Sequence, residues 1–170
     1  GTFIGDPGSP PVIAIAPGVA VPRSRGSVRL AGAEAGDAPL ITLNFLEHPE
    51  DQKIMLEGIR LAWEVLHSPE LGPLVTKALP PVSEIIDSDE ALVDWARSTC
   101  GSGWHPVSTA RMGSESDEAA VVDQHGRVRG VDRLRIADAS VMPLTVAVPT
   151  NLTCMMIGER IAEWMRTEPD

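Results

Sequence analysis

Hydrophobic residues recur at helical spacing in three segments of the chain. In the first, Pro49 suits the start of a helix, and one apolar stripe follows it before the chain reaches Pro69. In the second, Ser88 is placed to cap a helix that ends near Cys100. A third helix is predicted from about Leu152 to Met165. The stripe of the first helix consists of Met55, Ile59, Ala62 and Leu66, and that of the third of Cys154, Ile157, Ile161 and Trp164.

Shorter runs of alternating or β-branched residues predict strands before the first helix and between the second and third. The runs are residues 12–16, 19–21, 27–31 and 40–45, a hairpin over 121–129 and a strand over 134–136. Residues 1–11 are rich in glycine and proline and predict an irregular lead-in or linker. Residues 69–87 contain four prolines and are expected to form mostly loop. Short strands mixed with separated helices predict an α+β fold.

Length and charge narrow the class of protein. The 170 residues suffice for one domain, or slightly more, with a real hydrophobic core. With 24 acidic and 14 basic residues the formal charge is −10, so a phosphate backbone would repel the chain and nucleic-acid binding is not expected. No apolar run approaches the roughly 20 residues that a membrane-spanning helix requires. Because the chain begins without methionine, we expect residues upstream of it.

Several common functional motifs are missing from the sequence. Two cysteines, Cys100 and Cys154, make no disulfide framework and favour a reducing, cytoplasmic compartment without establishing one. No CxxC or HExxH pattern occurs, so no metal site is expected. Residues 101–103 begin a GxGxxG pattern, but His105 and Pro106 follow where a third glycine should open a helix. The chain alone therefore carries no dinucleotide-binding fingerprint.

Histidine is the side chain best suited to proton transfer near neutral pH, and the chain has four. His48 precedes a helix that it can cap, His67 closes a helix, and His125 lies in a polar turn, so these three are expected to be structural or exposed. His105 differs, because it lies between glycines in the segment 101–113 and Pro106 fixes the chain directly after it. From local sequence alone, a backbone-bonded loop histidine and a functional histidine are equally good interpretations.

The segment around His105 resembles the active-site segment of the glucose–methanol–choline (GMC) flavin oxidoreductases. Further segments follow at the spacing of that family, and two upstream segments fit the start of the same C-terminal region. In chain order, the matching segments are 24–30, 37–41, 104–113, 121–123, 127–131, 134–143 and 150–160. The match covers nearly everything from about Val12 onward, and several ordered motifs make it far more specific than any single motif.

The resemblance implies a substrate-binding domain over residues 12–129, built mainly of antiparallel sheet backed by helices. A strand–helix segment over residues 130–170 would return to a Rossmann-like FAD-binding domain supplied elsewhere. That partner would be an N-terminal FAD-binding half, from the same precursor or from a separate chain. The implied cofactor is FAD, the implied substrate is a small alcohol, and residues 1–11 would be the lead-in.

The resemblance also implies the site residues. His105 would accept the hydroxyl proton of the alcohol while hydride passes from carbon to flavin N5, and Asn151 is the second catalytic candidate. Asp138 and Ala139 would approach the phosphate and ribityl region of FAD, and residues 149–152 would lie beside the isoalloxazine ring. The full set of expected cofactor contacts is Trp104, Asp138, Ala139, Pro149, Thr150, Asn151 and Leu152.

One departure from the family pattern affects the expected chemistry. A second histidine or asparagine usually lies two residues before the position of Asn151, and here that position is Pro149. Proline has neither a side-chain hydrogen-bonding group nor an N–H. Either Thr150 or Asn151 takes over by a local shift, or His105 acts alone, or the activity is altered.

Two alternatives to alcohol oxidation stay open at this point. One is a flavin-containing lyase of the hydroxynitrile type, in which flavin is bound but not reduced. The other is a non-catalytic module derived from the family. The sequence does not identify the alcohol, the acceptor that reoxidises the flavin, the oligomeric state, or whether the chain is a fragment, a nicked product or a separate subunit.

Overall fold

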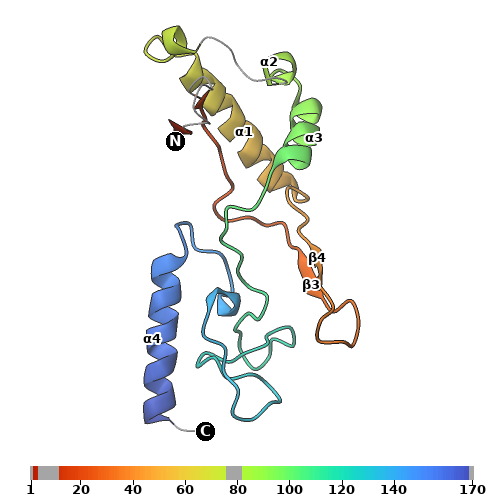
Figure 1. The fold of residues 1–170 in the computed structure, drawn as a ribbon, viewed down its shortest axis with the longest axis vertical. Coiled ribbons are helices and arrows are strands. Elements are labelled where there is room, and N and C mark those ends of the chain that lie inside the picture. The colour runs from red at the N-terminus through yellow and green to blue at the C-terminus, as the bar shows by residue number, and fades with distance from the viewer. Residues whose placement is uncertain (1, 4–11, 76–81, 169–170) are drawn as a thin grey trace. The chain divides into compact units, whose positions relative to one another are not determined.

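The computed structural model describes residues 2–3, 12–75 and 82–168, and the chain divides into two compact units (Figure 1). Unit 1 is formed by residues 1–19 and 45–100, and unit 2 by residues 20–44 and 101–170. The two units are defined by which residues lie close together within each unit. This division does not test the functional boundaries expected at residues 12 and 130, which stay predictions.

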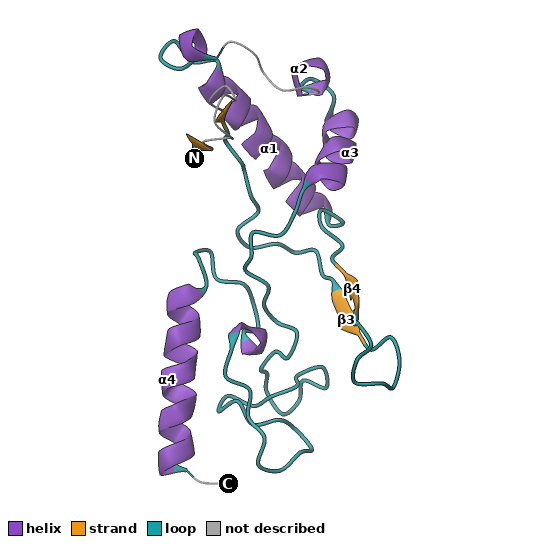
Figure 2. Cartoon of the chain, in the orientation of Figure 1, coloured by secondary structure: helices purple, strands orange, loops and turns teal. Residues whose placement is uncertain are grey.

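Unit 1 is built mainly of helices (Figure 2). They are α1 (Pro49–Leu66), the short 3₁₀ helix η1 (Gly72–Leu74), α2 (Val82–Ile85) and α3 (Asp89–Thr99). The predicted first two helices are therefore confirmed, with their caps. His48 Nδ1 accepts a hydrogen bond from the Glu50 N–H at 3.2 Å, and Ser88 Oγ accepts one from the Ala91 N–H at 3.3 Å. These bonds satisfy backbone donors that a helix N-terminus leaves unpaired.

The core of unit 1 lies where α1 meets α3. Its buried members are Leu46, Leu56, Ile59, Leu92 and Ala96. Helix α2 lies inside the segment 69–87 that was expected to be mostly loop, and that expectation is wrong at 82–85. Its apolar residues Val82 and Ile85 pack against this core, so burial stabilises a helical turn that local sequence does not indicate. Residues 76–81 lie outside the described residues.

The remaining element of unit 1 is a small antiparallel pair. Strand β1 (Thr2–Phe3) pairs with β2 (Val12–Ile13), in the register Thr2↔Ile13 and Phe3↔Val12. The predicted strand over 12–16 is thus shorter than expected, and residues 19–21 form no strand. Pro17 and Pro22 lack the N–H that a strand ladder needs, so neither run can continue past its proline. Residue 1 and residues 4–11 of the expected lead-in lie outside the described residues.

Unit 2 contains the second antiparallel pair. Strand β3 (Ser27–Arg29) pairs with β4 (Leu40–Thr42) through Ser27↔Thr42, Val28↔Ile41 and Arg29↔Leu40. Gly26 directly precedes β3, and a Cβ at this position would lie only 2.2 Å from the Thr42 carbonyl oxygen, so a larger residue does not fit there. With helices and small antiparallel pairs, the chain has the predicted α+β class.

The core of unit 2 joins its last helix to the chain segments before it. The buried members are Val122, Val141, Met142, Ile157 and Ile161. The last two lie on α4 (Asn151–Thr167), the predicted third helix, and Val141 ends the short 3₁₀ helix η2 (Ala139–Val141). The predicted hairpin over 121–129 is confirmed by the antiparallel bridge Val122↔Val128. The expected strand over 134–136 is reduced to the single bridge Arg127↔Arg135. Within the described chain, no neighbouring strand of greater length lies beside it.

The C-terminal end of α4 is fixed to the hairpin. The His125 ring stacks on Trp164, with centroids 4.6 Å apart and planes 11° from parallel, and His125 Nδ1 lies 2.9 Å from Glu168 Oε2. Arg135 donates a hydrogen bond to the Glu168 carbonyl oxygen at 3.0 Å. His125 therefore has the structural role expected for it. Within the described residues, no helix is both long enough and apolar enough to cross a membrane.

Two glycines of unit 2 provide a stability test. Gly126 and Gly130 both have positive φ, at 74° and 76°. A Cβ at residue 126 would lie 2.7 Å from both the Ile136 oxygen and Ile161 Cδ1, whereas nothing lies within 4 Å at residue 130. We expect Gly130→Ala to reduce the free energy of unfolding by about 1 kcal/mol through backbone strain alone. Gly126→Ala should cost about 1–3 kcal/mol more, because it also overpacks the core.

The two losses can be measured by urea unfolding of the intact protein that contains this chain, followed by tryptophan fluorescence. Equal losses for the two variants would contradict the close packing of Gly126 against α4.

Candidate active site

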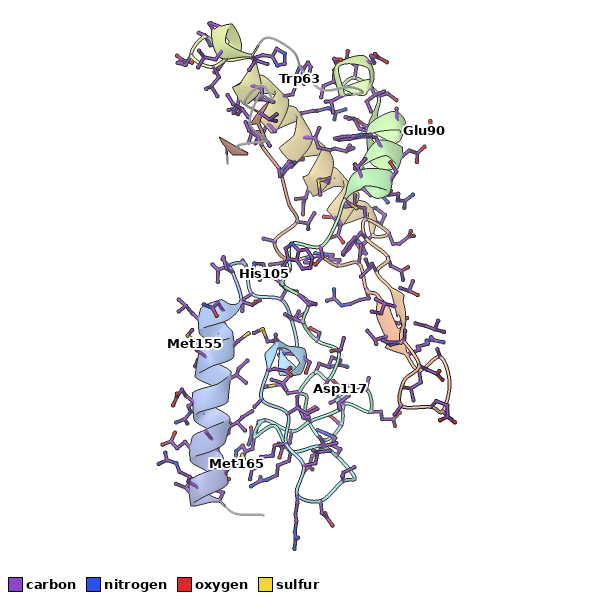
Figure 3. The ribbon with its side chains drawn as sticks, viewed as in Figure 1. Trp63, Glu90, His105, Asp117, Met155 and Met165 are labelled. Atoms are coloured by element: carbon purple, nitrogen blue, oxygen red, sulfur yellow. The ribbon has the colours of Figure 1, made fainter. Side chains whose placement is uncertain are left out.

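His105 lies in unit 2, where its ring meets the start of α4 (Figure 3). His105 Nδ1 is 3.0 Å from Thr150 Oγ1, a contact between residues 45 positions apart in the sequence. Thr150 is the N-cap residue of α4 and is only 7% exposed. The structure thus brings together two of the residues singled out from the sequence.

Unusual backbone angles flank His105. Trp104 has φ 64° and Ser108 has φ 71°, both in the left-handed region that residues with a side chain rarely adopt. Such angles cost roughly 1–3 kcal/mol each and persist where the surrounding structure enforces them, often at functional sites. Neither Gly101 nor Gly103, the two glycines just before His105, has a positive φ.

A ladder of backbone hydrogen bonds holds the loop after His105. The N–H groups of Ser108, Ala110 and Met112 donate to the carbonyl oxygens of residues 139, 140 and 141, at 3.4, 3.0 and 2.9 Å. The segment 108–112 therefore runs beside η2, whose Val141 lies in the core under α4. This ladder connects the His105 loop to the chain that leads into α4.

The far end of the same loop is braced by charged side chains. Arg111 makes a bidentate ion pair with Asp117, with N–O distances of 2.5 and 3.0 Å. Hydrogen bonding from Arg111 holds the pKa of the Asp117 carboxyl below its usual range. Arg129 donates to the Gly113 carbonyl oxygen at 2.8 Å. These contacts fix the chain where it leaves the ladder.

Asp138 caps η2. Its Oδ1 accepts a hydrogen bond from the Ser140 N–H at 2.8 Å. Hydrogen bonds from the Ser140 side chain and backbone lower the pKa of Asp138, so its carboxylate form is favoured. Ala139 follows as the first residue of η2 and is half-buried. No hydrogen bond joins either residue to His105 within the described chain, and their contact with a cofactor stays a prediction.

The other expected cofactor contacts are open to solvent in this chain. Trp104 is 88% exposed and Leu152 is 77% exposed. Pro149 and Asn151 are also exposed, and the Asn151 side chain makes no hydrogen bond within the described residues. Asn151 is therefore not brought to His105, whereas Thr150 is. From the sequence, either Thr150 or Asn151 could supply the hydrogen-bonding side chain that Pro149 lacks, and nothing in the sequence favours one over the other.

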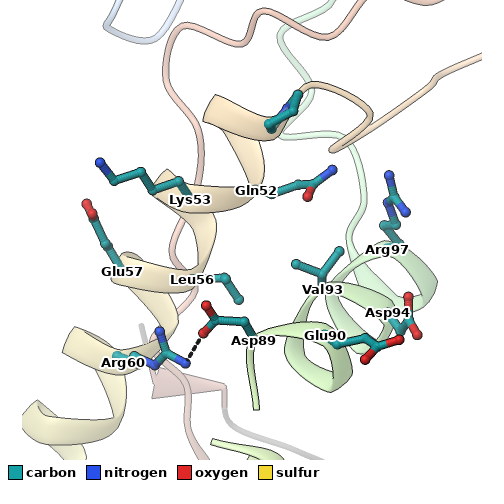
Figure 4. A pocket seen from close by; sticks show the side chains of 11 residues that line it. Gln52, Lys53, Leu56, Glu57, Arg60, Asp89, Glu90, Val93, Asp94 and Arg97 are labelled. Carbon is teal, nitrogen blue, oxygen red and sulfur yellow. Dashed lines mark hydrogen bonds and ion pairs between the residues drawn. The ribbon is translucent and has the colours of Figure 1, made fainter. Parts of the chain in front are cut away.

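A separate groove lies in unit 1, between α1 and α3 (Figure 4). Charges of both signs line it, and Arg60 pairs with Asp89 across it at 2.5 Å. It contains none of the residues expected at the site. The described residues also hold no cluster of three or more histidine, cysteine or acidic side chains that could bind a metal ion.

Comparison with known proteins identifies the family. The family model of the GMC oxidoreductases matches residues 22–158, which is most of the chain. The chain belongs to the GMC oxidoreductase family. The match includes the His105 loop, η2 and the first half of α4, so the sequence resemblance is confirmed.

Individual GMC oxidoreductases are similar over nearly the whole chain. Choline oxidase of Arthrobacter globiformis is 42% identical over 155 residues, which cover 90% of this chain and 28% of that protein. Oxygen-dependent choline dehydrogenase of Escherichia coli is 36% identical over 143 residues, covering 84% of this chain and 25% of that protein. A structure of Aspergillus oryzae formate oxidase, in a study of FAD modification, superposes with a TM-score of 0.75 at 31% identity, covering 85% of this chain and 25% of that one.

The chain therefore spans about a quarter of the length of these GMC relatives. All three are oxidases or dehydrogenases, so neither the lyase nor the non-catalytic alternative is favoured.

The cap at Asp138 predicts a specific pH dependence of stability. Asp138→Ala removes the acceptor for the Ser140 N–H and should lower the free energy of unfolding by about 1 kcal/mol or less at neutral pH. Because the folded protein lowers the pKa of Asp138, this stabilisation is present above the ordinary value of about 3.9 and is lost as pH falls through the folded value. Unfolding measured from pH 7 down to about 3 should show the difference between wild type and variant shrinking.

Asp138→Asn is the matched control, because its side-chain oxygen can still accept from Ser140 while its charge is gone. A difference between wild type and Asp138→Ala that grows toward low pH would rule out this role of the carboxylate.

Proposed function

We propose that this chain is the substrate-facing part of an FAD-dependent oxidoreductase that oxidises alcohols. The observation that carries the proposal is the position of His105, held at the start of α4 by Thr150 in a chain 42% identical to a choline oxidase. The GMC family membership supports the reaction class, and the FAD modification studied in the formate oxidase of Aspergillus oryzae supports the cofactor.

The residues around His105 suit a large, planar cofactor with an electron-rich edge, such as FAD. Trp104 and Leu152 offer exposed apolar surface, and no side chain caps the first turn of α4. An uncapped helix start presents free N–H donors and positive potential. Residues 149–152 and Trp104 would hold the flavin, and Asp138 and Ala139 would lie toward the rest of the cofactor. When bound, FAD supplies the hydride acceptor.

His105 is suited to take the proton that leaves the alcohol. Its Nδ1 is occupied by Thr150, and the residue is otherwise exposed, so its other nitrogen is available to a substrate. The alcohol O–H proton passes to His105 as the C–H bond gives up hydride, and the product is a carbonyl compound. The ladder over residues 108–112 fixes the loop that carries the imidazole. This matters because the base and the hydride acceptor must both reach the same carbon of the substrate.

The activity requires a partner that this chain does not supply. We propose an N-terminal FAD-binding part, from the same precursor or a separate chain, since the matched region covers only 28% and 25% of the two choline-oxidising relatives. Exposed apolar side chains support this, because such surface on a free chain favours association. They lie on the β3–β4 pair and on α4: Val28, Leu40, Ile41, Leu152, Met155, Met156 and Met165.

The proposal predicts the effect of His105→Gln in the flavin-loaded protein, meaning this chain together with its FAD-binding part. Anaerobic mixing with a panel of primary alcohols should bleach the flavin of the wild type, and choline is the first alcohol to test because two relatives are named for it. His105→Gln should slow bleaching about 10²- to 10⁴-fold, the usual contribution of a general base.

His67→Gln is the matched control, because His67 closes α1 in unit 1 and has no part in the proposed site. It should bleach at the wild-type rate. Equal rates for His105→Gln and wild type, or a wild type that no alcohol in the panel bleaches, would overturn the proposed function.

A further inference from the structure

We propose that Thr150 is a positioning residue that fixes the tautomer of His105. Its hydroxyl oxygen accepts a hydrogen bond from His105 Nδ1–H and leaves Nε2 with the lone pair that takes the substrate proton. The kinetic part of this inference rests on the proposed function, but the tautomer can be observed without it. The evidence is the contact of 3.0 Å between Nδ1 and Thr150 Oγ1 and the burial of Thr150.

A neutral imidazole carries one N–H and one lone pair, so the partner of Nδ1 decides what Nε2 can do. If the Thr150 hydroxyl donates to Nδ1, then Nε2 carries the hydrogen and cannot act as a base. If Thr150 accepts from Nδ1–H, then Nε2 is a base. Since Thr150 occupies Nδ1 in both cases, a proton-accepting role for His105 requires Thr150 to accept.

The backbone of Thr150 explains why its oxygen is available to accept. A threonine at a helix N-cap usually has an extended backbone and uses its oxygen to accept from an N–H of the first turn. Thr150 instead has φ −73° and ψ −11°, a helical conformation, and its side chain makes no capping bond. Its acceptor capacity is therefore directed to His105 instead of to α4.

This arrangement also gives a role to the departure at Pro149. Pro149 offers no side-chain donor or acceptor, and the next residue supplies a side-chain oxygen instead. That oxygen is buried and bonded to His105, so it acts through the histidine and not on the substrate. Asn151, the other candidate, is exposed and makes no side-chain hydrogen bond within the described chain.

The direct test is nitrogen NMR of the intact, flavin-loaded protein labelled with ¹⁵N-histidine, with the His105 signals assigned through His105→Gln. At a pH where His105 is neutral, the wild type should show a protonated Nδ1 and an unprotonated Nε2. Thr150→Val, which keeps the shape but loses the oxygen, should shift the signals toward protonation at Nε2. Thr150→Ser should restore the wild-type pattern.

A second readout is kinetic. Thr150→Val should lower kcat for alcohol oxidation about tenfold, the effect of one hydrogen bond, while KM changes by less than about twofold. Thr150→Ser should recover most of the rate. Thr167→Val is the matched control, because it removes a threonine hydroxyl bond at the other end of the same helix, where Oγ1 donates to the Glu163 carbonyl oxygen at 3.0 Å. It should change neither readout.

The outcomes separate this inference from the proposed function. A wild type protonated at Nε2, or a Thr150→Val variant with unchanged tautomer, overturns the role of Thr150 even if His105 is needed for alcohol oxidation. A Thr150-dependent Nδ1–H tautomer in a protein whose flavin no alcohol bleaches supports the positioning role while the proposed function fails. If Thr150→Val does not fold, a wild type protonated at Nε2 still overturns the inference, and a wild type protonated at Nδ1 supports it.

Discussion

The backbone ladder between residues 108–112 and η2 is the constraint on which the candidate site depends. Without it, the loop that carries His105 would have few fixed points, because Trp104 and His105 themselves are exposed. The ladder ties that loop to Val141, which is buried against the inner face of α4. The same core therefore places both partners of the His105–Thr150 hydrogen bond. The positive φ of Ser108 is tolerated because its N–H is held in this ladder.

Local signals were sufficient to predict the three long helices α1, α3 and α4. Each has an apolar stripe and two have a capping side chain, and these patterns depend only on neighbours in sequence. Strands were predicted less well, since a run of β-branched residues forms a strand only where a partner lies beside it. Residues 19–21 and 134–136 show this. Helix α2 was not predicted for a related reason, because its helical turn depends on burial against residues far away in the sequence.

The motif order pointed to His105, but its contact with Thr150 could not be derived from the sequence. The two residues are 45 positions apart, and a threonine before a helix is expected to cap that helix. Only the helical backbone of Thr150 shows that its oxygen is free for another partner. That contact also joins the predicted substrate-binding region to the predicted cofactor-completing segment. Unit 2 contains the segment 130–170 together with only part of the expected substrate-binding region, residues 20–44 and 101–129.

The attachment of α4 at its C-terminal end has a mechanical consequence for its other end. The 17 residues of α4 form a rod about 25 Å long, anchored by the Trp164–His125 stack and by Glu168, with Thr150 at the opposite tip. A rod pivoting at its anchor amplifies small rotations, so a tilt of about 2° displaces the tip by about 1 Å, enough to impair a reaction that depends on precise placement. The contacts around His125 therefore help to set the direction of α4, and with it the position of Thr150 beside His105.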